Sequence, residues 1–470
     1  MVSAVAALCP PELAKRLRPA LGWLLGSNLA SQAMRLGSSL VLTRLLLPEA
    51  FGLVAAVQTL YFALVMFSDL GVWQSVVTSP RGNAPQFLGT AMSVQLARGA
   101  LLALVVLTVA AGLQWCAVYA PFAPETVYAD ARLPWMVAVF ALCALLQGAE
   151  SMHLASAQRE LRAGLLARVE LLSQLAGMLV TVALALLTRS VWSLVVGTVT
   201  ATLARTALSH SLLSGPAYRI CWDKGCAGEL VHFGKWIFLS SIIGFAASSG
   251  EKLILGGILP AATFGTFSIA ALLLAAISGL VGNLNAHLVF PGLSEALRSS
   301  DAVALRVYTR MQQSADAILG VIAGGTFVAG GWVVHLLYDT RYAGAAWMLQ
   351  LLGLGLMAIR YQVLEQMMFA RGKPAWVTLS NALRATSLVI FVPLGYAWAG
   401  ERGAVIAVVA SQFVGWPVSI AFKMRSHWMR WQSEVVWPVS LAAGMAAGWA
   451  VDQLLSNWSA TRAFHLLVTL

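Results

Sequence analysis

Charged side chains are scarce in this sequence. Asp, Glu, Lys and Arg make up 10% of the 470 residues, while apolar residues make up 59%. Soluble globular domains carry about 25% charged and about 45–50% apolar residues, so a soluble enzyme and a disordered chain are both excluded. The apolar residues form continuous runs of about twenty instead of alternating, which disfavours a transmembrane β-barrel. The composition therefore predicts an all-α, polytopic membrane protein.

Acidic residues are the rarer charged class. Nineteen Asp and Glu stand against 30 Lys and Arg, which gives a net charge of +11. In so apolar a chain, a basic excess is typical of the cytosolic loops between membrane spans. The charge therefore indicates a lipid bilayer as the partner, and no nucleic-acid partner is predicted.

Cysteine is also rare, which excludes a disulfide scaffold. Cys221 and Cys226 are the pair closest together among the five cysteines, and no second pair completes a zinc site. The sequence also lacks a nucleophile–base constellation and a Gly-rich phosphate loop. It therefore predicts no catalytic residue, no metal and no cofactor.

Thirteen apolar runs are long enough to cross about 30 Å of hydrocarbon. They lie near 21–47, 50–77, 87–113, 133–155, 166–188, 190–213, 234–258, 262–289, 315–337, 343–369, 374–397, 402–424 and 434–455. The tail 456–470 is too short to cross again, so it either lies at the surface or begins a fourteenth helix. The segment 290–314 is predicted to be a cytosolic amphipathic helix.

The distribution of basic residues sets the orientation. With a cytosolic N-terminus, eighteen Lys and Arg fall on the inner side and six on the outer side. Such a bias predicts that the N-terminus is inside. The apolar first nine residues precede the basic stretch at Lys15, Arg16 and Arg18, which is not the order of a cleaved signal peptide.

The chain resembles itself at a fixed shift. Trp23 recurs as Trp236 and Phe51-Gly52 recurs as Phe264-Gly265, both at a shift of 213 residues. Chance similarity between apolar helices is the alternative explanation. A true repeat predicts two six-helix lobes in parallel orientation with a transport pathway between them. The predicted organisation is a cytosolic segment 1–20, a lobe 21–213, a cytosolic linker 214–233, a lobe 234–425 and an extra helix with its tail 426–470.

Polar side chains form a stripe on one face of the first and seventh predicted spans. The first stripe contains Asn28, Gln32, Arg35, Ser39 and Thr43, with Ser31 and Ser38 beside them, and the second contains Ser241, Ser248, Glu251 and Lys252. A charge at mid-bilayer costs at least about 2.5–3.5 kcal/mol, so both stripes are expected to face a wet cavity. Asp69, Asn283 and Asn285 are weaker candidates on the second and eighth spans.

Other charges within the spans have a structural interpretation. We expect interhelical ion pairing or snorkelling for this set: Arg98, Glu150, Glu170, Arg205, Asp316, Arg360, Glu365 and Arg384.

Several short motifs occur in a characteristic order. They are Leu42-Thr43-Arg44-Leu45-Leu46-Leu47-Pro48-Glu49-Ala50-Phe51-Gly52, Asp69-Leu70-Gly71, Glu251-Lys252-Leu253-Ile254-Leu255-Gly256, Phe290-Pro291-Gly292-Leu293-Ser294 and Arg371-Gly372-Lys373-Pro374. With them the chain resembles the Wzx-type repeat-unit flippases among the polysaccharide transporters of the multidrug/oligosaccharidyl-lipid/polysaccharide exporter superfamily. The family more often has Asp at the position of Glu251.

The resemblance implies a flippase of the bacterial inner membrane working by alternating access. Its central cavity would be lined by the first, second, seventh and eighth spans. Its substrate class would be polyprenyl-diphosphate-linked oligosaccharide for exopolysaccharide, capsule or O-antigen (lipopolysaccharide) synthesis. Polysaccharide polymerase and chain-length machinery are candidate partners.

Cationic groups suit a diphosphate headgroup. Arg35 and Lys252 are therefore the predicted charge-bearing residues, with Asn28, Gln32, Ser241, Ser248, Asn283 and Asn285 as further substrate contacts. Asp69 and Glu251 are candidates for ion coupling. The alternative for Arg35 is an ion pair with Asp69 or Glu251 that holds the lobes.

Two rival functions remain open at this point. A drug or cation antiporter of the same superfamily would need a predominantly acidic cavity, whereas here two acids oppose two bases. A membrane glycosyltransferase or polymerase normally displays catalytic carboxylates or histidines on a large outer loop, and the sequence has no such loop.

Overall fold

The helices of this chain follow the apolar runs of its sequence. The computed structural model describes residues 11–119, 122–160, 162–285 and 289–468. Within these ranges the regular structure is helical, apart from one isolated bridge between Thr126 and Pro260. The predicted all-α class is therefore confirmed.

The chain divides into two compact units between Gly265 and Thr266. This division follows spatial contacts, whereas the predicted lobes follow the sequence repeat. The lobe boundaries 21–213 and 234–425 therefore stay predictions, and each unit is described by itself.

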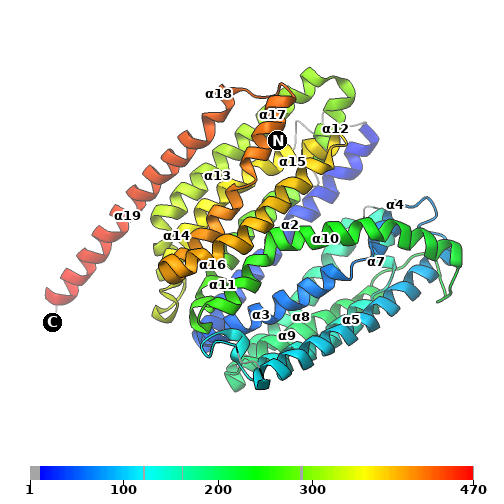
Figure 1. The fold of residues 1–470 in the computed structure, drawn as a ribbon, viewed down its shortest axis with the longest axis horizontal. Helices are drawn as coiled ribbons and strands as arrows, with labels where there is room; N and C mark the ends of the chain where they lie inside the picture. Colours follow the sequence, from blue (N-terminus) through cyan, green and yellow to red (C-terminus); the bar gives the residue numbers. More distant parts are fainter. Residues whose placement is uncertain (1–10, 120–121, 161, 286–288, 469–470) are drawn as a thin grey trace. The chain divides into compact units, whose positions relative to one another are not determined.

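The first unit holds the helices up to α10. They are α2 (Pro11–Leu45), α3 (Pro48–Phe67), α4 (Val72–Thr78), α5 (Pro85–Tyr119), the 3₁₀ helix η1 (Val127–Ala129), α6 (Leu133–Gly148), α7 (His153–Arg159), α8 (Ala163–Thr188), α9 (Trp192–Ser211) and α10 (Lys224–Ile258). In this unit α8 packs on α9, α5 on α6, α2 on α8 and α10 on α3 (Figure 1).

Small residues let these helices approach closely. A Cβ atom added to Gly99 of α5 would lie 2.7 Å from the Cα of Gly148 in α6, and one added to Gly177 of α8 would lie 2.6 Å from the Cβ of Ala201 in α9. Such contacts are typical of helix pairs in membranes, where van der Waals packing drives association. They explain why these crossing points carry glycine.

The second unit starts within α11 and ends with the C-terminal helix. Its elements are α11 (Ala261–Leu284), α12 (Phe290–Ser299), α13 (Asp301–Leu337), the 3₁₀ helix η3 (Thr340–Tyr342), α14 (Ala345–Gly355), the 3₁₀ helix η4 (Leu356–Tyr361), α15 (Gln362–Ala370), α16 (Pro374–Phe413), α17 (Trp416–Arg425), α18 (Trp431–Glu434) and α19 (Val436–Val468). Here α13 packs extensively on α19 and on α14. Figure 1 shows α19 (red) extending away from the other helices of this unit at its C-terminal end.

Most predicted spans correspond to helices long and apolar enough to cross a membrane. Eight such stretches lie in the described residues, and the bent pair α6–α7 makes a ninth. One of the eight, Pro374–Arg425, contains two predicted spans, because α16 turns back at Ala399 and Gly400. The three other predicted spans correspond to the helices α2, α9 and α10, which carry polar side chains along their length.

Four boundaries differ from the prediction. The run 50–77 is interrupted after Phe67, the run 133–155 bends by 59° after Gly148, and the segment 290–314 breaks at Ser300. Ser300 starts a new helix because its hydroxyl accepts a hydrogen bond from the Val303 amide at 3.2 Å. The tail after Ser456 continues α19 to Val468 instead of starting a further helix.

Candidate functional site

The polar stripe of α2 borders α8 along one edge. The Ser31 hydroxyl donates to Gln174 Oε1 of α8 at 2.6 Å, and Gln174 Nε2 donates to the Ser31 carbonyl at 3.0 Å. At 100° per residue, Arg35 is rotated about 40° from Ser31 around the helix axis. Arg35 is exposed, whereas Asn28 and Gln32 are half-buried. The stripe is therefore partly covered by α8, and its arginine stays accessible.

Other hydroxyls of the stripe bond to their own helix. Ser38 donates to the Arg35 carbonyl at 3.0 Å, and Ser39 donates to the Leu36 carbonyl at 2.8 Å. Back-bonding of this kind satisfies the donor capacity of a hydroxyl within its own helix. Ser39 is 4% exposed, so part of the predicted stripe packs inside the protein.

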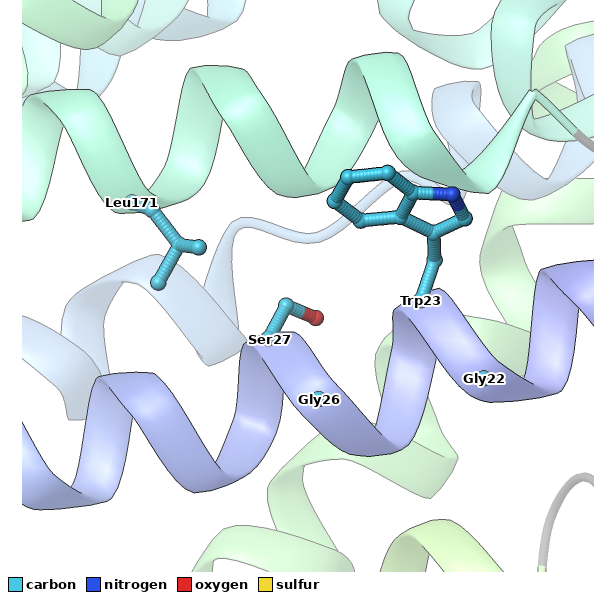
Figure 2. A pocket seen from close by; sticks show the side chains of 5 residues that line it. All are labelled: Gly22, Trp23, Gly26, Ser27 and Leu171. Carbon is cyan, nitrogen blue, oxygen red and sulfur yellow. The ribbon is translucent and has the colours of Figure 1, made fainter.

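A groove lies between α2 and α8 on the N-terminal side of Ser31. It has a volume of about 460 Å³ and is lined by Gly22, Trp23, Gly26, Ser27 and Leu171 (Figure 2). The Trp23 ring fills the space above Gly164, where an added Cβ would lie 3.3 Å from the indole. The two helices therefore stand apart here and come together at Ser31 and Gln174.

Asp69 stabilises a turn of the backbone. Its Oδ1 atom accepts a hydrogen bond from the Gly71 amide at 2.9 Å, and Gly71 has a φ of 59°. Arg98 of α5 donates to the carbonyls of Ser68 at 2.7 Å and Val65 at 3.0 Å, which caps the end of α3. Within the described residues no ion pair joins Arg35 to Asp69 or to Glu251. The role of Asp69 in ion coupling stays a prediction.

The α10 stripe lies on a helix that packs against α3 and α5. Ser241, Glu251 and Lys252 are half-buried, and Ser248 is exposed. Just beyond them, the Tyr128 hydroxyl of η1 donates to the Leu253 carbonyl at 3.0 Å. A Cβ on Gly257 would lie 3.2 Å from the Tyr128 ring, so glycine makes room for this contact.

Asn283 and Asn285 belong to the second unit. Asn285 is 4% exposed, and its Nδ2 donates to Gln362 Oε1 at 3.0 Å. Asn283 is half-buried. In this structure Asn285 is therefore engaged by α15, and both substrate assignments stay predictions.

Ion pairing explains several charges within the spans. Arg205 of α9 contacts Glu150 at 3.0 Å and Glu170 at 2.5 Å, and Arg360 contacts Asp316 at 2.6 Å. The interpretation of these five residues as interhelical ion pairs is confirmed. The sequence did not reveal one further pair, Lys423 and Glu434. Lys423 is 1% exposed and forms an ion pair with Glu434.

The predicted linker belongs to the first unit, where hydrogen bonds join it to α5. The Ser93 hydroxyl donates to the Cys221 carbonyl at 2.7 Å, and the Asp223 amide donates to Thr90 Oγ1 at 3.2 Å. Hydrogen bonds with Cys226 lower the pKa of the Asp223 carboxyl. Hydrogen bonds from Ser79 and Arg81 likewise hold the pKa of Glu229 below its ordinary value. Both carboxylates therefore anchor the start of α10 in their charged form.

Metal ligation has no support in the described ranges, because no three His, Cys, Asp or Glu side chains gather there as a possible ion site. The charged side chains of the polar stripes on α2 and α10 are Arg35, Glu251 and Lys252. Arg35 and Lys252 form no ion pair with the described residues. Such groups suit the recognition of an anion.

A model of the family described as "Polysaccharide biosynthesis protein" matches residues 41–347, which is more than half of the chain. The chain belongs to this family. A curated relative, an uncharacterized membrane protein in the cps region of Klebsiella pneumoniae, is 20% identical over 393 residues, which cover 82% of this chain and 77% of the relative.

Solved structures share the architecture of this polysaccharide biosynthesis protein. The lipid II flippase MurJ in an inward closed conformation matches with a TM-score of 0.67 and 10% identity, over 90% of this chain and 92% of MurJ. An inward-facing multidrug resistance MATE family transporter of the MOP superfamily matches with a TM-score of 0.61 and 14% identity, over 90% and 96% of the two chains. These identities show the fold alone. Together with the family they support a multi-pass membrane protein of polysaccharide biosynthesis.

Proposed function

We propose that this protein moves polyprenyl-diphosphate-linked oligosaccharide repeat units from the cytosolic to the outer leaflet by alternating access. The observation that carries the proposal is the family match over residues 41–347. The product would enter exopolysaccharide, capsule or O-antigen synthesis. We place the protein in the bacterial inner membrane with its N-terminus in the cytosol, and we assign it no catalytic residue.

The accessible cations on the two polar helices support an anionic substrate. Arg35 of α2 is exposed, and Lys252 of α10 is half-buried. A diphosphate that leaves water needs charge-assisted hydrogen bonds to replace its hydration. The guanidinium of Arg35 provides a planar fork for two phosphate oxygens, and the ammonium of Lys252 provides a point charge.

Membrane potential provides a driving force of the correct sign. Each negative charge that moves outward from a cell interior at −100 mV gains about 2.3 kcal/mol. Asp69 and Glu251 remain our candidates for additional ion coupling. A polymerase that consumes the flipped repeat unit on the outer side is the partner we expect.

A clean deletion tests this function in cells. In a strain with no second flippase gene, loss of the protein should leave lipid-linked oligosaccharide in the cytosolic leaflet and stop the corresponding surface polysaccharide. Normal polysaccharide export in that strain would refute the proposal. Restored export with a plasmid copy is the matched control for polar effects on neighbouring genes.

A further inference from the structure

Four charged side chains are buried together in the second unit. They are Asp316 of α13, Arg360 of η4, Lys423 of α17 and Glu434 of α18. The side chains of Asp316, Arg360 and Lys423 are 0–1% exposed, and that of Glu434 is 12% exposed. A buried charge is costly unless it is paired and hydrogen-bonded, so this cluster requires complete pairing.

The cluster is fully paired. Arg360 Nε and Nη2 donate to the two carboxylate oxygens of Asp316 at 2.8 and 2.6 Å. Arg360 Nη2 also donates to Glu434 Oε2 at 2.8 Å, and Lys423 Nζ donates to Glu434 Oε1. An aromatic ring also contacts the cluster, because Lys423 Nζ lies 5.3 Å from the centroid of the Tyr361 ring, within the range of a cation–π interaction.

Glu434 supplies the charge that makes the cluster neutral. The three residues that precede α18 contribute two cations, Arg360 and Lys423, and one anion, Asp316. Without Glu434 one positive charge would be buried without a counter-charge, which is strongly destabilising. The helices up to α17 therefore form an incomplete ion site, and the segment that begins at α18 completes it.

The glycine contacts between α13 and α19 do not by themselves define the axial register of the two helices. Gly320 and Gly324 on α13 and Gly444 and Gly448 on α19 are each four residues apart. A Cβ on Gly324 would lie 2.3 Å from the Leu441 carbonyl oxygen, and one on Gly444 would lie 2.4 Å from the Val321 carbonyl oxygen. A slip of four residues, about 6 Å along the axis, would again place small residues against the partner helix.

We propose that Glu434 is a register lock, which docks α18 and α19 on α13 in one register by completing the buried ion site. A one-turn slip would carry Glu434 about 6 Å along the axis and leave Arg360 and Lys423 without their shared acid. Specifying register is the best-attested use of a buried polar group in helix packing. Two further bonds join the helices in the observed register: Ser440 Oγ donates to the Asp316 carbonyl at 2.8 Å, and Trp332 Nε1 donates to Asp452 Oδ1 at 2.7 Å.

Disulfide trapping in the full-length protein reads the register directly. The five native cysteines are first replaced. An added Cβ at Gly448 would lie 3.1 Å from the Cβ of Val328, so Val328→Cys with Gly448→Cys reports the native register. Val328→Cys combined with Gly444→Cys or with Asp452→Cys reports a one-turn slip in either direction.

The lock predicts a defined pattern of cross-links under mild oxidation. With Glu434 present, the native pair should form and the slip pairs should not. In Glu434→Gln the rate of native cross-linking should fall about tenfold or more, and a slip pair should appear. Adding Lys423→Met to Glu434→Gln restores neutrality through Asp316 and Arg360, so native cross-linking should recover. Glu295→Gln, which removes an exposed ion pair with Arg298 on α12, should change nothing.

Two results would overturn the lock. One is native cross-linking in Glu434→Gln within about twofold of the parent, since that would show that the glycine contacts alone set the register. The other is a double variant, Glu434→Gln with Lys423→Met, that does not recover native cross-linking. This criterion also applies if Glu434→Gln alone does not accumulate. Neither result depends on which substrate the protein transports, so the inference and the proposed function can fail separately.

Discussion

Gln174 on α8 and Ser31 on α2 exchange two hydrogen bonds, at 2.6 and 3.0 Å, and so fix which face of α2 meets α8. This exchange sets the direction in which the rest of the α2 stripe points. Because Arg35 is rotated by about 40° from Ser31, it remains close to this contact but is not covered by it.

Loss of this contact should destabilise the first unit. We expect Gln174→Ala to lower the free energy of unfolding by about 1–3 kcal/mol, because the Ser31 hydroxyl then loses its acceptor. Thermal unfolding of Gln174→Ala, Ser31→Ala and the double variant forms a double-mutant cycle. Strict additivity of the two single effects would contradict a direct interaction.

Close contact between α5 and α6 should make Gly99 intolerant of a side chain. A Cβ there would lie 2.7 Å from the Cα of Gly148, so Gly99→Ala should cost about 1–3 kcal/mol by overpacking. Gly112 of the same helix has no atom within 4 Å of an added Cβ and is the matched control. Gly112→Ala should be neutral or slightly stabilising. Equal melting temperatures for the two variants would contradict the observed packing.

The sequence could predict where helices occur but not where they break. Continuous apolar runs identify helices because few other structures satisfy the backbone inside a bilayer. The break after Phe67 depends on Arg98, which lies on another helix and caps the carbonyls of Val65 and Ser68. The bend after Gly148 is likewise supported from α9, where the Ser209 hydroxyl accepts from the Ser151 amide at 3.0 Å. Such partners are distant in sequence and leave no local pattern.

The candidate site was only partly predictable, again because contacts with a neighbouring helix leave no local pattern in the sequence. Periodicity places Asn28, Gln32 and Arg35 on one face of a helix, and the structure keeps them there. Periodicity does not reveal the neighbouring helix, so Gln174 was missed although it is a polar residue within an apolar run. Lys423 and Glu434 were missed as a pair because they lie on different helices on either side of a loop.

Topology can be tested with two exposed positions. We expect an impermeant thiol reagent added outside intact cells to label Ala399→Cys and to spare Lys224→Cys, in a background without native cysteines. Both side chains are exposed, and Ala399 has a negative φ, unlike the neighbouring Gly400 at 60°. Labelling in the opposite sense would show that the positive-inside assignment is wrong.

The anchor at the start of α10 should weaken in acid. Hydrogen bonds from Ser79 and Arg81 lower the pKa of Glu229 in the folded protein. A lowered pKa stabilises the fold above the pKa of the unfolded chain, about 4.3, and this stabilisation is lost as pH falls through the folded value. The melting temperature of Glu229→Gln should therefore lie below that of the parent at pH 7, and the difference should shrink on acidification. A difference that stays constant from pH 7 down through the folded pKa of Glu229, to about pH 3, would count against the anchor.

Reconstitution tests the central claim most directly. Purified protein in liposomes should carry polyprenyl-diphosphate-linked oligosaccharide across the bilayer, measured as sugar that becomes accessible to a glycosidase added outside. Arg35→Ala and Lys252→Met should abolish this movement while the protein remains folded, and Arg35→Lys should retain part of it because a point charge still attracts phosphate. Arg298→Ala, at an exposed ion pair of α12, is the control that should transport normally. Failure to move the lipid-linked sugar, together with expulsion of a cationic dye against an ion gradient, would contradict the flippase and identify a cation exporter instead.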